Sequence, residues 1–134
     1  MEICGSDIHA FLGHDEKKPA TLILGYEAAG VVVQGLMEGK RVTFNLLATC
    51  GKCKACLRGQ DNICTSRQII SMQLRQGAVA ELVTIPDVNL VEVPDQIEFD
   101  QAALTEPIAC GWHIAKSSQR NISIDLGSAN ALII

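Results

Sequence analysis

The stretch Cys50-Gly-Lys-Cys-Lys-Ala-Cys-Leu-Arg-Gly-Gln-Asp-Asn-Ile-Cys64 brings four cysteines, Cys50, Cys53, Cys56 and Cys64, into one short segment. The short gaps between the first three allow their sulfur atoms to turn toward one point, and the longer last gap allows the chain to close the fourth corner. Four thiolates are a ligand set for tetrahedral Zn²⁺, and they leave no position open for water. The sequence therefore predicts a structural zinc site in this loop.

Three other uses of four cysteines are alternatives. Disulfides suit an exported chain, whereas the start Met1-Glu-Ile-Cys4 has neither a basic leader nor a long apolar region. A redox Cys-x-x-Cys motif does not need four cysteines. An iron–sulfur motif usually has a shorter last gap followed by proline, whereas Thr65 follows Cys64 here. Zinc is the preferred interpretation, and three basic side chains are expected to offset the thiolate charge: Lys52, Lys54 and Arg58.

Composition limits the class of protein. The chain has 134 residues, of which 48% are hydrophobic, enough for one domain with a core. A net charge of −4 without a block of Lys or Arg argues against nucleic acid as a partner. Without an export leader or an apolar run of about 20 residues, the chain is expected to be cytoplasmic, with no membrane partner.

Short apolar runs alternate with Gly and Pro turns along most of the chain, which is typical of a small all-β domain. The expected fold class is mainly β with short helices, built as a partly open β-barrel. Strands are expected at residues 21–33, 41–45, 77–86, 89–94 and 130–134. The polar segment 14–19 is expected to be a solvated loop.

Helices are expected in two parts of the chain. Near the start, Ser6 or Asp7 could cap a short helix that reaches Phe11. Later, Asp100 could cap the stretch 101–104, and Pro107 could begin a helix that continues through residues 108–116.

Two small groups of reactive side chains lie outside the cysteine loop. The first is Cys4-Gly-Ser-Asp-Ile-His9, for which an ordinary turn with a buried cysteine is an equal alternative to a site. The second is Glu106, Cys110 and His113, whose spacing puts Cys110 and His113 on one face of a helix. By itself, the second group is better interpreted as a capping Glu, a core Cys and a surface His.

Taken together, these segments resemble one family, the zinc-dependent medium-chain alcohol and polyol dehydrogenases. The likeness rests on five segments in the family's order: residues 4–9, 24–30, 50–64, 77–81 and 102–107. The resemblance implies a GroES-like catalytic domain over residues 1–120. It also implies that residues 121–134 begin a Rossmann domain that binds NAD or NADP.

The resemblance further implies a second, catalytic zinc that polarises an alcohol oxygen while a hydride passes to the nicotinamide. Its implied ligands in this chain are Cys4, Glu27 and Glu106. Ser6 matches the hydroxyl that receives the alcohol proton, and His9 matches the outer member of that relay. Cys110 falls near a second thiolate of some alcohol dehydrogenases. The implied substrate is a small-molecule secondary alcohol or polyol, and homo-oligomers are common in the family.

The chain departs from the family pattern at Tyr26, where the family has a histidine that ligates zinc. A phenol with a pKa of about 10 is a poor substitute for imidazole at neutral pH. Either the catalytic zinc is weak or absent, which we favour, or Glu27, Glu106 and Cys110 rearrange around it.

The chain also ends at Ile134, before the expected Gly-rich phosphate-binding turn. We therefore expect an oxidoreductase of the alcohol or polyol dehydrogenase type, whose 134 residues do not transfer hydride by themselves. The alternative is a non-catalytic GroES-like module with a structural zinc.

Overall fold

The computed structural model describes residues 1–121 and Gly127, so the strand expected at 130–134 lies outside the described residues. Elements in chain order are α1 (Gly5–Phe11), β1 (Ala29–Val31), β2 (Arg41–Phe44), β3 (Leu47–Ala48), η1 (Cys56–Arg58), η2 (Asp61–Ile63), β4 (Gln68–Ile69), η3 (Asp87–Asn89), β5 (Leu90–Glu92), α2 (Phe99–Ala103) and α3 (Thr105–Asn121), where η marks a 3₁₀ turn.

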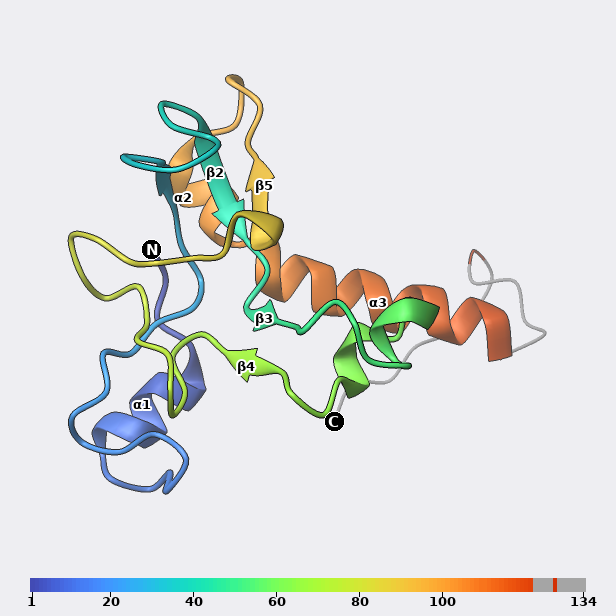
Figure 1. Cartoon of the computed structure of the whole chain (residues 1–134), viewed down its shortest axis with the longest axis horizontal. Coiled ribbons are helices and arrows are strands. Elements are labelled where there is room, and N and C mark those ends of the chain that lie inside the picture. Colours follow the sequence, from blue (N-terminus) through green and yellow to red (C-terminus); the bar gives the residue numbers. More distant parts are fainter. Residues whose placement is uncertain (122–126, 128–134) are drawn as a thin grey trace.

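The strands form two small antiparallel sheets. The larger has the order β1-β2-β5, with Gly30 opposite Val42 and Thr43 opposite Val91, and the smaller pairs β3 with β4. Within the described part of the chain neither sheet closes on itself, which confirms an open β architecture (Figure 1). Because β3 follows β2 after two residues, the larger sheet leads directly into the cysteine loop.

A small core holds these sheets together. Phe44, Ile70 and Ala78 are buried at its centre, and Tyr26 packs against them. The backbone at Gly77 passes so close to residues 24–25 that a Cβ atom there would collide with the carbonyl oxygens of both. Glycine is therefore required where this segment crosses.

Two of the expected strands are wrong in extent. Of residues 21–33, only β1 is a strand, and residues 77–86 contain none. Their backbones do meet, since the N–H groups of residues 77–79 donate to carbonyls of residues 23–25. The close crossing at Gly77 replaces a regular ladder, and sequence alternation alone could not reveal that.

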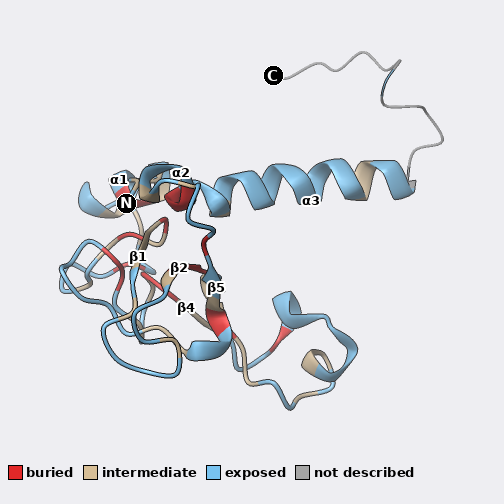
Figure 2. Cartoon of the chain, turned by 90° about the horizontal axis from the view of Figure 1, so that it is seen from above, coloured by how far each residue is buried: buried red, intermediate tan, exposed pale blue. Residues whose placement is uncertain are grey.

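The helices begin at residues other than those expected. Cys4 is the N-cap residue of α1, and its N–H donates to the carboxylate of Asp7 at 3.3 Å. Glu98, rather than Asp100, is the N-cap residue of α2. The helix expected at 108–116 is longer in the structure, where α3 spans Thr105–Asn121. Most of α3 is exposed (Figure 2). In the part of the chain described, no helix combines the length and apolarity needed to cross a membrane.

Candidate metal centre and adjoining polar cluster

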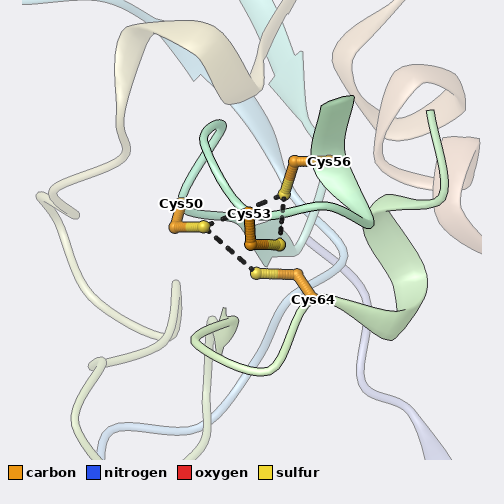
Figure 3. A group of neighbouring side chains, drawn as sticks. All are labelled: Cys50, Cys53, Cys56 and Cys64. Atoms are coloured by element: carbon orange, nitrogen blue, oxygen red, sulfur yellow. Dashed lines mark hydrogen bonds between the residues drawn. The ribbon is translucent and has the colours of Figure 1, made fainter. Parts of the chain in front are cut away.

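The four loop cysteines converge on one point, as the spacing predicts. Their sulfur atoms all lie within 4.8 Å of one another, and three pairs are 3.5 Å (Cys53 and Cys56), 3.6 Å (Cys50 and Cys64) and 4.0 Å (Cys50 and Cys56) apart (Figure 3). A tetrahedron with Zn–S bonds of about 2.3 Å has sulfur atoms about 3.8 Å apart. The donor set and its spacing therefore fit a four-coordinate zinc ion, for which Cys50, Cys53, Cys56 and Cys64 would be the ligands.

The loop owes its shape to two 3₁₀ turns between the ligands. The first, η1, ends at Gly59, whose left-handed backbone (φ 71°) reverses the chain. The second, η2, delivers Cys64, which is fully buried. The side chain of Asn89 donates to the carbonyl oxygens of Asn45 and Leu47 at 2.6 and 2.8 Å. These bonds fix the chain where it enters the loop.

Backbone groups tune the thiols of the loop. Hydrogen bonds from the N–H groups of Lys52 and Cys53 lower the pKa of Cys50 to about 6, and the N–H of Cys56 lowers the pKa of Cys53. Burial among the other thiols raises the pKa of Cys56 to about 12. The leading cause for Cys50 is thus the backbone of Lys52, whereas the sequence had pointed to the charged side chains.

A second polar cluster surrounds Asp7 of α1. Its carboxylate is buried and accepts hydrogen bonds from the Lys18 ammonium at 2.8 Å, the Gly25 N–H at 3.2 Å and the Ser71 hydroxyl at 3.4 Å. The Lys18 side chain has no exposed surface. The expected solvated loop at 14–19 is therefore wrong for this residue, because the ammonium turns inward to a buried carboxylate. No feature of the sequence near Lys18 signals that partner.

Lys18 also contacts the Ser6 hydroxyl and the Tyr26 ring next to the ion pair. Its ammonium donates to Ser6 Oγ at 3.2 Å and lies 5.0 Å from the centre of the Tyr26 ring. Ser6 Oγ and the Tyr26 hydroxyl are hydrogen-bonded at 3.0 Å. Ser6, predicted as a site residue, is thus part of a connected network that the structure extends to Tyr26 and Lys18.

The predicted ligands of a second metal lie near this network. Cys4 acts on the ionisation of both of its neighbours, since it adds to the raised pKa of Tyr26 and counteracts the raised pKa of Glu27. Burial, with the charge of Glu106 adding to it, raises the pKa of Glu27. A hydrogen bond to Glu106 at 3.3 Å raises the pKa of the Cys110 thiol. The charges of Glu106, Cys4 and Glu27 therefore all act on Cys110, near the start of α3.

The side chains of Cys4, Glu27, Glu106 and Cys110 are not arranged to bind a catalytic zinc ion, whereas the loop cysteines are arranged to bind a structural one. Across residues 1–121, the loop cysteines are the one group of three or more His, Cys, Asp or Glu ligand atoms close enough together for a metal ion. The phenol of Tyr26 adds a neutral hydroxyl that is already bonded to Ser6. The assignment of Cys4, Glu27 and Glu106 as ligands stays a prediction.

In the described part of the chain, no histidine takes part in the hydrogen bonds of the polar cluster around Asp7. His9 is exposed on α1, with its ring centre 6.2 Å from that of His14. His113 lies on α3, where its ring contacts the Ser117 hydroxyl at 3.5 Å. The role of His9 as the outer member of a proton relay stays a prediction.

Tyr26 is the only tyrosine in the chain, so its ionisation can be measured directly by absorbance. Burial and a hydrogen bond with Cys4 raise its pKa, while the Ser6 hydrogen bond acts in the opposite direction. We expect the tyrosinate band to appear only well above pH 10, and the Ser6→Ala change to move it higher still. Circular dichroism at each pH would confirm that the chain remains folded.

The same shift predicts how stability depends on pH. Because the folded chain keeps its phenolic proton where the unfolded chain has lost it, the free energy of unfolding should fall as pH rises above about 10. Tyr26→Phe should remove this contribution. A tyrosinate band that appears at or below pH 10 in the folded chain would contradict the expectation.

Comparison with known proteins now identifies the family. Residues 1–95 match the model of the alcohol dehydrogenase GroES-like domain. The chain belongs to this family. It is 32% identical to L-threonine 3-dehydrogenase of Deinococcus radiodurans over 98% of the chain, and 37% identical to sorbitol dehydrogenase of Halalkalibacterium halodurans over 87%.

The structure agrees with this assignment. It superposes on a solved NAD-dependent alcohol dehydrogenase with a TM-score of 0.66, at 33% identity, over 75% of this chain and 31% of the other. The chain spans 38% of the threonine dehydrogenase and 36% of the sorbitol dehydrogenase. The resemblance to the medium-chain alcohol and polyol dehydrogenase family, predicted from the sequence motifs, is therefore confirmed.

Proposed function

We propose that this chain is the GroES-like catalytic part of an NAD- or NADP-dependent alcohol dehydrogenase that oxidises a secondary alcohol or polyol. Residues 1–120 form that part, and residues 121–134 begin the dinucleotide-binding domain. The hydride acceptor is the nicotinamide ring, which supplies the redox chemistry when bound. The chain's own contribution is to bind the alcohol, to take up its proton at Ser6, and to hold its fold together through the four-cysteine loop.

One observation carries the proposal: the polar cluster of α1 adjoins the predicted metal-ligand positions of α3 at one surface. Ser6 and Cys4 come from the start of the chain, whereas Glu106 and Cys110 come from its last described helix. Cys4 and Glu27 both lie within electrostatic reach of Cys110. The start of the chain and the start of α3 are thus close together, and the Ser6 hydroxyl beside them can receive a proton. Such an arrangement is suitable for binding and oxidising an alcohol.

The proposal is tested with a chimeric enzyme, in which this chain replaces the matching segment of a related dehydrogenase. In the sorbitol dehydrogenase of Halalkalibacterium halodurans, the matched segment is replaced by this chain, leaving the relative's remaining length in place. We expect the zinc-loaded chimera to reduce NAD⁺ or NADP⁺ with a secondary alcohol or polyol, measured by absorbance of the reduced cofactor. Ser6→Ala should lower kcat, because it removes the hydroxyl that is proposed to receive the alcohol proton.

Ser66→Ala serves as the matched control, since Ser66 is exposed and follows the cysteine loop. A chimera that folds and binds both zinc and the dinucleotide, yet oxidises none of a panel of secondary alcohols and polyols, would contradict the proposal. That outcome would favour the non-catalytic zinc module.

A further inference from the structure

We propose that Ser6 and Tyr26, fixed by the Lys18 ammonium, form a metal-free site that binds one oxygen atom of a small alcohol or carbonyl compound. The site at Ser6 and Tyr26 binds no zinc ion, and zinc binds only in the four-cysteine loop. The identity of the ligand rests on the proposed function, whereas the exclusion of zinc does not.

Lys18 determines which groups donate and which accept in this network. An ammonium group can only donate, so Ser6 Oγ must accept from Lys18 Nζ, 3.2 Å away. The second ammonium donor goes to Asp7 at 2.8 Å, and the face of the Tyr26 ring lies on a third side. With no exposed surface, the Lys18 side chain has little freedom to turn elsewhere. Ser6 is therefore held in one place by a fully buried cation.

Two hydroxyl hydrogens remain for the Ser6 and Tyr26 pair. One makes the bond between the two oxygens at 3.0 Å. The other can be donated outward on the side of Cys4, which acts on the pKa of the Tyr26 phenol. Sulfur is a weak acceptor, so an alcohol or carbonyl oxygen would be a better partner for the same hydrogen. Ser6, Tyr26 and Cys4 are only half-buried, so part of the surface of this group faces solvent.

The same arrangement disfavours a metal ion. The phenol of Tyr26 is neutral near pH 7, and the Lys18–Asp7 ion pair beside it carries no net charge, so neither attracts a divalent cation. Asp7 cannot serve as a metal ligand instead, because its carboxylate already accepts hydrogen bonds from Lys18, Gly25 and Ser71. Within residues 1–121, the ligand atoms of Cys4, Glu27 and Glu106 do not converge as those of the loop cysteines do. Hydrogen-bond donors thus take the place of a Lewis acid at this position.

The first experiment counts zinc ions and protected thiols in the full chain. All six cysteines are free thiols in the structure. In chain saturated with zinc, we expect one bound ion, protection of the four loop cysteines from iodoacetamide, and alkylation of Cys4 and Cys110 at rates that excess zinc does not change. Peptide mass spectrometry identifies the modified residues. Two bound ions, or protection of Cys4 by added zinc, would overturn the proposal.

Tyr26→His tests whether the phenol is what keeps zinc away. We expect this variant to bind a second zinc ion and to protect Cys4 in a zinc-dependent manner, because imidazole is a good zinc ligand. A variant that still binds a single zinc would show that Tyr26 does not decide the matter, and the proposal would fail.

The second experiment measures ligand binding with sorbitol as the probe, by saturation-transfer NMR on the zinc-saturated chain. Tyr26→Phe and Ser6→Ala should each weaken sorbitol binding by about 2- to 10-fold, the loss expected for one hydrogen bond. Ser66→Ala should leave it unchanged. Absence of sorbitol binding, or equal binding by all variants, would overturn the oxygen site. Hydride transfer by the chimera is a separate measurement, so either proposal can fail alone.

Discussion

Cys53→Ala is expected to release the loop zinc and to lower the free energy of unfolding by several kcal/mol at saturating zinc. Metal binding at such a site is folding energy, because the unfolded chain has no preformed cage. Cys53 lies 3.5 Å from Cys56, so its loss leaves three thiols around an open corner. The measurement is zinc content by atomic absorption, with urea unfolding of the same samples.

Cys110→Ala is the matched control, because Cys110 is exposed on α3 and lies outside the loop. It should keep its zinc and unfold close to the wild-type urea concentration. If Cys53→Ala retained a full complement of zinc, the four-cysteine assignment would be wrong.

Lys18→Met should destabilise the chain by about 3 to 5 kcal/mol, the usual cost of removing one partner from a buried ion pair. The methionine keeps most of the stem and removes only the charge and its hydrogen bonds. Asp7 would then be a buried carboxylate without its counter-charge, although Gly25 and Ser71 would still donate to it. Urea unfolding at fixed zinc concentration measures the change.

The neighbouring lysine gives a close control. Lys17 is exposed, and Lys17→Met should change stability by no more than about 0.5 kcal/mol. Adding Asp7→Asn to Lys18→Met should recover part of the loss, since the unpaired charge is then gone. Equal stability of Lys17→Met and Lys18→Met would show that the ion pair contributes nothing to the fold.

The zinc loop is the part of the molecule that sequence predicts best. Its ligands are close in the chain, so spacing alone limits how the sulfur atoms can be arranged, and the structure brings all four together. The strands at Arg41–Phe44 and Leu90–Glu92 were also predictable from local apolar pattern and flanking turns. In each case the decisive interactions are between residues close in the chain, or follow from the alternation of apolar residues along a short strand.

The strand predicted at residues 77–86 failed for the opposite reason. Its apolar character is real, but its backbone partners are residues 23–25, which lie some fifty positions earlier in the chain. The fit there depends on the close approach at Gly77, which is a property of two segments together. A pattern within one segment cannot report such a constraint.

By itself, the sequence determined that this chain has a four-thiol loop suited to zinc, carries the motifs of one dehydrogenase family, and has Tyr26 where the resemblance implies a histidine. Only the tertiary structure decided which side chains that tyrosine contacts, because its partners Ser6 and Lys18 come from segments separated from it in the chain. A buried lysine in a polar loop has the same sequence signature as a solvated one. Its burial depends on where the carboxylate of Asp7 lies after folding.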